Sequence, residues 1–130
     1  MSLVLDAGAL IALDRNNRNV WAMLRIASDD AQIVQVPVAA IAQAWRNSSR
    51  QVLLIRALRH CEEITLDAPA ARAAGLLCGR SGTADIIDAS VALTAAGLGR
   101  RIPVSVLTSD PDYLHHLLAI LRADVNIVEV

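Results

Sequence analysis

Short apolar stretches alternate with amphipathic ones along the whole chain. Residues 2–5 form an apolar run, and residues 31–37 alternate between apolar and polar positions up to a proline, as strands do. The same reasoning predicts three further strands, at residues 63–66, 103–108 and 126–130. Helical spacing and helix-start residues predict a short helix ending at Asp14 and longer helices at residues 17–27, 38–45, 50–61, 67–78, 83–96 and 110–122. A glycine-rich loop is expected at residues 79–82.

This alternation of strands and helices favours a parallel sheet, because parallel strands need long crossover connections that helices usually supply. We therefore expect an α/β fold in three layers, with helices on both faces of a twisted, mostly parallel sheet of five strands. No repeat or linker divides the sequence, so residues 1–130 are expected to form a single domain.

Composition excludes several classes of protein. Hydrophobic residues make up 55% of the chain and charged residues 19%, which argues against disorder. No apolar run approaches the roughly 18 residues of a membrane span, and the first residues lack the basic segment of a signal peptide. The expectation is a cytoplasmic protein without membrane contact, in which Cys61 and Cys78 are free thiols. Every basic residue is an arginine, which excludes chemistry that needs a lysine.

Acidic residues follow two of the predicted strands. Asp6 comes after the first strand and Asp110 after the fourth. Ligands of open α/β sheets bind beyond the carboxyl ends of the strands, so these carboxylates converge if the two strands are neighbours. Asp85 and Asp88 lie three apart on a predicted helix and are expected to share a face. Clustered carboxylates should raise the pKa of at least one member, and their hard oxygens suit Mg²⁺ or Mn²⁺.

A capping role explains some of the same acids. Asp6 and Asp110 each precede a predicted helix, and Pro111 suits the first position of the second one. Asp85, just after Thr83 at the expected helix start, complements the helix dipole. Asp88 is expected beyond the first turn, where capping does not explain it. Both interpretations stay open for Asp6 and Asp110.

Four segments carry a recognisable order of motifs: LVLDAGALIAL at residues 3–13, VPVAAIAQAWR at 36–46, GTADIIDASVALTA at 82–95 and VLTSDPDYLHHL at 106–117. Together they resemble the successive motifs of PIN domains, most closely those of small bacterial toxins of the VapC-like type. The resemblance covers nearly the whole chain. It implies a twisted parallel sheet with flanking helices and a ribonuclease activity that depends on Mg²⁺ or Mn²⁺.

The resemblance also implies roles for individual residues. Asp6, Asp88 and Asp110 match the acids that bind the metal and carry out catalysis. The positions expected to support them are Gln43, Asp85, Thr108, Ser109 and Asp112. Gln43 stands where the family usually has a glutamate, which removes one negative charge and one possible base.

Binding of RNA would need local positive charge, because the net charge of the chain is −1. Arg46 and Arg50, just past Gln43, and Arg80, in the glycine-rich segment, are the candidates. RNA is the implied substrate and an antitoxin protein a possible partner. The high apolar content predicts a homodimer, with an interface that involves residues 38–61.

Three other functions compete with a nuclease. Because of Gln43, a degenerate PIN domain that binds RNA or a protein without efficient cleavage stays open. A phosphoacceptor domain of the receiver type needs a lysine, which the chain lacks. A haloacid-type phosphatase needs Asp-x-Asp after the first strand, where this chain has Asp6, Ala7 and Gly8.

Overall fold

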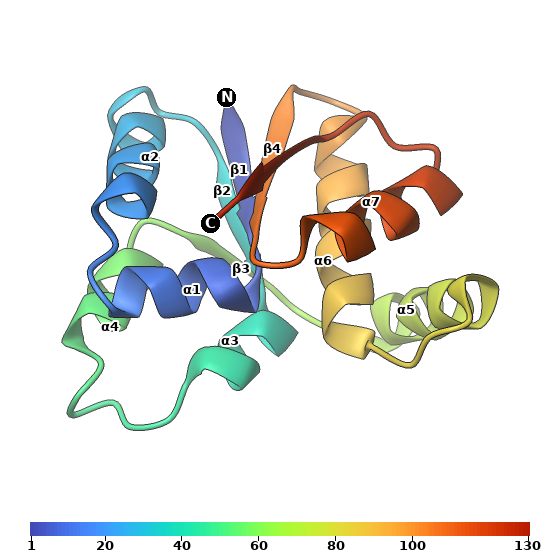
Figure 1. Ribbon diagram of the computed structural model, residues 1–130, viewed down its shortest axis with the longest axis horizontal. Helices are drawn as coiled ribbons and strands as arrows, with labels where there is room; N and C mark the ends of the chain where they lie inside the picture. The colour runs from blue at the N-terminus through green and yellow to red at the C-terminus, as the bar shows by residue number, and fades with distance from the viewer.

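A computed structural model describes residues 1–130 as seven helices around one five-stranded sheet (Figure 1). The strands are β1 (Ser2–Leu5), β2 (Val34–Pro37), β3 (Glu62–Ile64), β4 (Val104–Thr108) and β5 (Asn126–Glu129). The helices are α1 (Ala7–Asp14), α2 (Arg18–Asp29), α3 (Val38–Ala44), α4 (Val52–Leu58), α5 (Ala68–Ser81), α6 (Ile86–Gly99) and α7 (Pro111–Ile120). Every element expected from the sequence is present, with boundaries that differ by a few residues.

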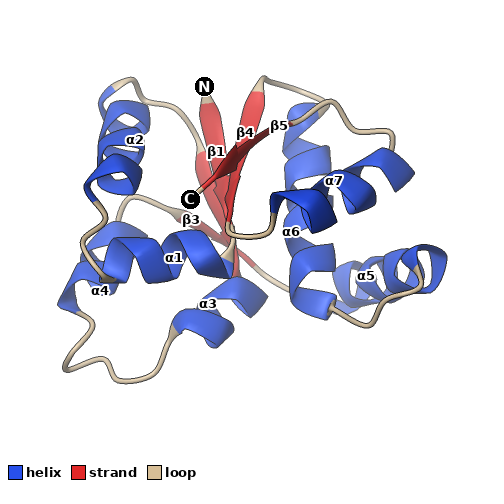
Figure 2. Cartoon of the chain, viewed as in Figure 1, coloured by secondary structure: helices blue, strands red, loops and turns tan.

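The sheet has the order β3-β2-β1-β4-β5, and all four neighbouring pairs are parallel. Helices α1, α2 and α4 lie on one side of the sheet and α5, α6 and α7 on the other (Figure 2). This confirms the expected three-layer α/β fold. No helix combines the length and the apolar character that crossing a bilayer requires.

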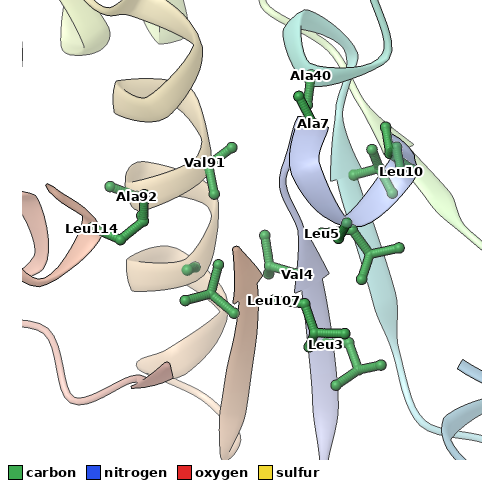
Figure 3. Packing of buried hydrophobic residues seen from close by; sticks show 14 of the residues in the cluster. Leu3, Val4, Leu5, Ala7, Leu10, Ala40, Val91, Ala92, Leu107 and Leu114 are labelled. Carbon is green, nitrogen blue, oxygen red and sulfur yellow. The ribbon is translucent and has the colours of Figure 1, made fainter. Parts of the chain in front are cut away.

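The core is centred on β1 and β4, in which every residue is buried. Helices cover both faces of these strands, so apolar residues occupy successive positions instead of alternating. Leu5 lies beside Leu10 of α1, whereas Val4 points to the side of α6 (Figure 3). Because β1 and β4 are neighbours, their carboxyl ends lie together, as the proposed convergence of Asp6 and Asp110 requires.

The prediction of a loop at residues 79–82 is wrong for residues 79–81, which are helical. Helix α5 continues through Ser81, and only Gly82 leaves it, in the left-handed conformation with φ of 73°. Glycine adopts this conformation without steric cost, which is why it ends helices so often. Gly79 is simply a helical residue.

The helix predicted to stop at Ala96 also runs further, through Gly97 to Gly99. Leu98 in this last turn is buried at 2% exposure. Burial of a leucine stabilises the turn by about 1.5–3 kcal/mol, which offsets the roughly 2 kcal/mol that the two helical glycines cost together. Packing against the core therefore overrides the stop signal.

Candidate functional site

Asp6 is held firmly at the junction of β1 and α1. It is 3% exposed, and its Oδ1 accepts a hydrogen bond from the Ala9 backbone N–H at 2.8 Å, as a helix N-cap does. Its Oδ2 accepts one from the backbone N–H of Ser109 at 3.2 Å, just past the end of β4. Burial raises the pKa of the Asp6 carboxyl, and hydrogen bonds from Thr108 and backbone N–H groups oppose that rise.

Asp110 lies just past the end of β4, the strand that pairs with β1, which Asp6 follows. Its carboxylate caps α7 by accepting from the backbone N–H of Tyr113 at 3.3 Å. The hydroxyl of buried Thr108 accepts from the Asp110 N–H at 2.9 Å, which fixes the backbone at this turn. Both Asp6 and Asp110 therefore have the capping role that the sequence left open.

The start of α6 differs from the prediction, and with it the roles of two acids. Asp85, not Thr83, is the N-cap, and its Oδ1 accepts from the Asp88 N–H at 3.0 Å. The Thr83 hydroxyl is engaged elsewhere, with the Ser81 hydroxyl at 3.0 Å and with the Tyr113 hydroxyl. Asp88 consequently lies in the first turn of α6 instead of beyond it.

Asp88 is the residue on which the other acids exert their electrostatic effect. It is half-buried, and that burial, followed by the nearby charges of Asp85, Asp6 and Asp110, raises its pKa from 3.8 to about 7. The expected raised pKa in an acidic cluster is thus confirmed. No three acidic, histidine or cysteine side chains are grouped closely enough to hold a metal ion. The arrangement is an acidic cluster and not a preformed coordination site.

Gln43 is a neutral amide and adds no charge to this acidic cluster. It is exposed near the end of α3 and lines an open groove of about 420 Å³. Arg46 and Arg50 line the same groove, so the structure places together three positions that the sequence linked. Arg15, at the end of α1, is a third arginine there that the sequence analysis missed. Its position directly after the predicted helix end at Asp14 was the available signal.

The other candidates lie apart from this groove. Arg80 belongs to the last turn of α5, and its guanidinium donates to the carbonyl of Ile120 at 3.2 Å, near the end of α7. Arg80 therefore stabilises a helix end and is not grouped with Arg46 and Arg50. Ser109 and Asp112 are both exposed, the second in the first turn of α7. Cys61 and Cys78 are free thiols, as expected.

Gly8 allows α1 to approach the turn after β4 closely. A Cβ on Gly8 would meet the Oγ of Ser109 and lie 2.5 Å from its Cβ. Side-chain rotation cannot move that Cβ away, and the Ser109 N–H is needed by Asp6. We expect Gly8→Ala to destabilise the protein by about 1–2 kcal/mol, because overpacking costs about 1–3 kcal/mol and alanine regains up to about 1 kcal/mol in a helix.

Chemical denaturation measures this effect. Gly75→Ala in α5 is the matched control, since a Cβ there meets nothing within 4 Å. That control should stabilise the protein by up to about 1 kcal/mol. If both variants were stabilised equally, the close approach at Gly8 would be wrong.

Comparison with known proteins supports the fold. No protein-family model matches the sequence, and no curated protein matches it. Among solved structures, the chain is similar to one in the VapBC2 complex from Rickettsia felis, solved bound to a DNA fragment from the promoter. The TM-score is 0.66 with 13% sequence identity, over 100% of this chain and 99% of that chain. At this identity the likeness concerns the fold alone, and it agrees with a three-layer, PIN-like domain.

Proposed function

We propose that this protein is a metal-dependent endoribonuclease, the toxin of a toxin–antitoxin pair. The observation that carries the proposal is the acidic cluster around Asp88 at the carboxyl ends of the central strands. This is the edge at which open α/β sheets bind their ligands. The VapC-type fold and the order of the motifs point to the same activity.

The donor atoms are of the kind that suits Mg²⁺ or Mn²⁺, and the side chains would have to move closer together to hold the ion. Asp6, Asp88 and Asp110 offer only carboxylate oxygens, the ligands that these hard cations prefer. Burial and, after it, the charges of the neighbouring acids raise the pKa of Asp88, and a divalent cation would offset those charges. When bound, such an ion would polarise a phosphoryl oxygen and lower the pKa of a coordinated water.

The residues of the chain have distinct tasks in this proposal. Asp6 is rigid, because both carboxylate oxygens accept backbone hydrogen bonds. Asp88, with a pKa of about 7, holds a proton in part of the molecules at neutral pH and releases it when a cation binds. Arg46 and Arg50 hold the phosphates of the RNA on the groove side.

A cleavage assay tests the proposed function. Total RNA incubated with the protein should be cut in Mn²⁺ or Mg²⁺ and left intact in chelator. Calorimetry of Mn²⁺ binding in two buffers of different ionisation enthalpy should show proton release. RNA that stays intact in every divalent cation, together with heats that are equal in both buffers, would overturn the proposal.

The degenerate-domain alternative depends on Gln43. Because Gln43 is exposed beside three arginines, we expect Gln43→Glu to leave the Tm in chelator unchanged or slightly higher. The added charge should strengthen attraction for a divalent cation, so the rise in Tm caused by Mn²⁺ should exceed that of the wild type. A rise equal to that of the wild type would show that position 43 does not act on the bound cation.

Self-association is the remaining proposal about assembly. Within residues 38–61, Val52 is 56% exposed and Trp45 is 39% exposed, which leaves apolar surface for a second copy. We expect a dimer by sedimentation velocity at tens of micromolar, and a monomer for Val52→Arg. Ile26→Arg, at a residue 62% exposed on α2, should stay dimeric. A wild-type monomer would refute the dimer, and a monomer only for Ile26→Arg would refute its location.

A further inference from the structure

A second arginine-lined groove lies between α2 and α4. It has a volume of about 410 Å³, and Arg18, Arg25 and Arg56 line it together with Asn16, Trp21, Ala22 and Leu53. No carboxylate lines this groove, and all three arginines are exposed. Asp29 lines only a smaller neighbouring cavity, with Arg25 and Trp21. None of these groove residues belongs to the acidic cluster.

The chemistry of the groove suits a polyanion, in which negative charges repeat along a chain. Three guanidinium groups gathered without a carboxylate repel one another, and binding of an anion relieves that repulsion. Guanidinium binds phosphate in a planar, two-pronged geometry. Trp21 is fixed in place, because its Nε1 donates to the carbonyl of Leu13 at 2.9 Å. An indole held in this way can stack a nucleic-acid base.

The two grooves adjoin at two places. At the end of α1, Arg15 lines the first groove and Asn16 lines the second. At the start of α4, Gln51 lines the first groove and Leu53 lines the second. Together they hold six of the twelve basic residues and a single carboxylate, Asp14. Helices α1, α2 and α4, which carry Asp14 and three of the six arginines, lie on the side of the sheet away from α5, α6 and α7 (Figure 1).

We infer that the groove between α2 and α4 is a second binding site for the phosphate backbone of single-stranded RNA, which continues the path past Gln43. The inference rests on the proposed function for the identity of the polyanion. RNA is favoured over an acidic peptide because a chain of phosphates can contact arginines in both grooves, and its bases can stack on the fixed indole of Trp21. The site strengthens binding and leaves the chemistry to the acidic cluster.

The test compares two triple variants that remove equal charge. The groove variant carries Arg18→Gln, Arg25→Gln and Arg56→Gln, and the control carries Arg72→Gln, Arg100→Gln and Arg101→Gln, all exposed residues outside both grooves. Both are made with Asp6→Asn, so that the RNA stays intact, and Trp45→Phe, so that Trp21 is the only tryptophan. The probe is a fluorescein-labelled oligouridylate of 20 nucleotides.

We expect the groove variant to bind the probe roughly tenfold more weakly at low salt than the control does. The slope of log affinity against log salt should fall by about 2, since each phosphate contact in a single strand contributes about 0.7. The unlabelled oligouridylate should quench Trp21 fluorescence in the control and not in the groove variant. Equal affinity and equal quenching in the two variants would overturn the inference. It would also be overturned if an oligoglutamate peptide displaced the probe at a lower concentration than unlabelled RNA does.

Cleavage separates this inference from the proposed function. With Asp6 intact, the groove substitutions should raise KM for RNA and leave kcat unchanged, because they remove contacts that bind the RNA and leave the acids in place. Binding results as expected with a wild-type protein that does not cut would refute the nuclease and keep the groove. A wild-type protein that cuts RNA, with equal KM in both triple variants, would keep the nuclease and refute the groove.

Discussion

Asp6→Asn is expected to lower the rate of RNA cleavage at least about 100-fold, because a bound cation supplies several kcal/mol of transition-state stabilisation and each 1.4 kcal/mol is worth a factor of ten. The asparagine keeps an oxygen for the Ala9 N–H, so the cap on α1 survives. Its amide nitrogen cannot accept from the Ser109 N–H, and it offers no negative charge. Single-turnover cleavage in Mn²⁺ measures the effect.

The matched control for this variant is Asp67→Asn. Asp67 caps α5 in the same way, by accepting from the Ala70 N–H at 2.9 Å, but it is exposed and takes no part in the pKa of Asp88. Asp67→Asn should cut RNA at the wild-type rate, and circular dichroism should show both variants folded. If Asp6→Asn cut as fast as the control, the cleavage would come from a contaminant and the acidic cluster would have no catalytic role.

Asp88→Asn is expected to stabilise the protein at pH 8 in chelator, by about 2 kcal/mol. The folded pKa of about 7 lies above the ordinary value of 3.8, so the folded protein binds more protons between these values. Stability is therefore full below about pH 4 and is lost as the pH rises towards 7. At about 1.4 kcal/mol per pKa unit the loss would be slightly above about 4 kcal/mol, and solvent screening of a half-buried carboxyl reduces it to about 2 kcal/mol.

Thermal melts across pH measure this difference. The Tm of Asp88→Asn should exceed that of the wild type by roughly 5–10 °C at pH 8, and the two should converge near pH 4. Added Mn²⁺ should raise the Tm of the wild type and not that of the variant, because the variant lacks the charge that a cation would offset. Equal pH dependence in the two proteins would show that Asp88 does not titrate in this range.

Much of the fold follows from local signals in the sequence. The apolar run at Ser2–Leu5 and the stretch that became β4 are buried strands, as their composition indicates. The caps at Asn17 and Asp67 stand where the residue types place them, because a side-chain oxygen next to free N–H groups is a local interaction. The order of the motifs also pointed to Asp6, Asp85 and Asp110, whose charges add to the rise in the pKa of Asp88.

Other features depended on contacts that local signals do not report. Thr83 and Asp85 both suit a helix start, and the choice between them was decided by Tyr113, thirty residues away, which engages the Thr83 hydroxyl. Arg80 lies in a segment typical of a loop, yet the end of α7 gives its guanidinium a partner. Each outcome depends on chain segments that meet only after folding.

The sequence by itself therefore determined the α/β class, the acidic character of the site and the absence of lysine from the chain. Only the tertiary structure decided the protonation of Asp88, because its pKa depends on burial and on carboxylates from three other places in the chain. It also decided that Arg15, Arg18 and Arg56 gather on one side of an acidic chain. Charge and burial act through space, so their effects are set by the packing of segments and not by their order in the sequence.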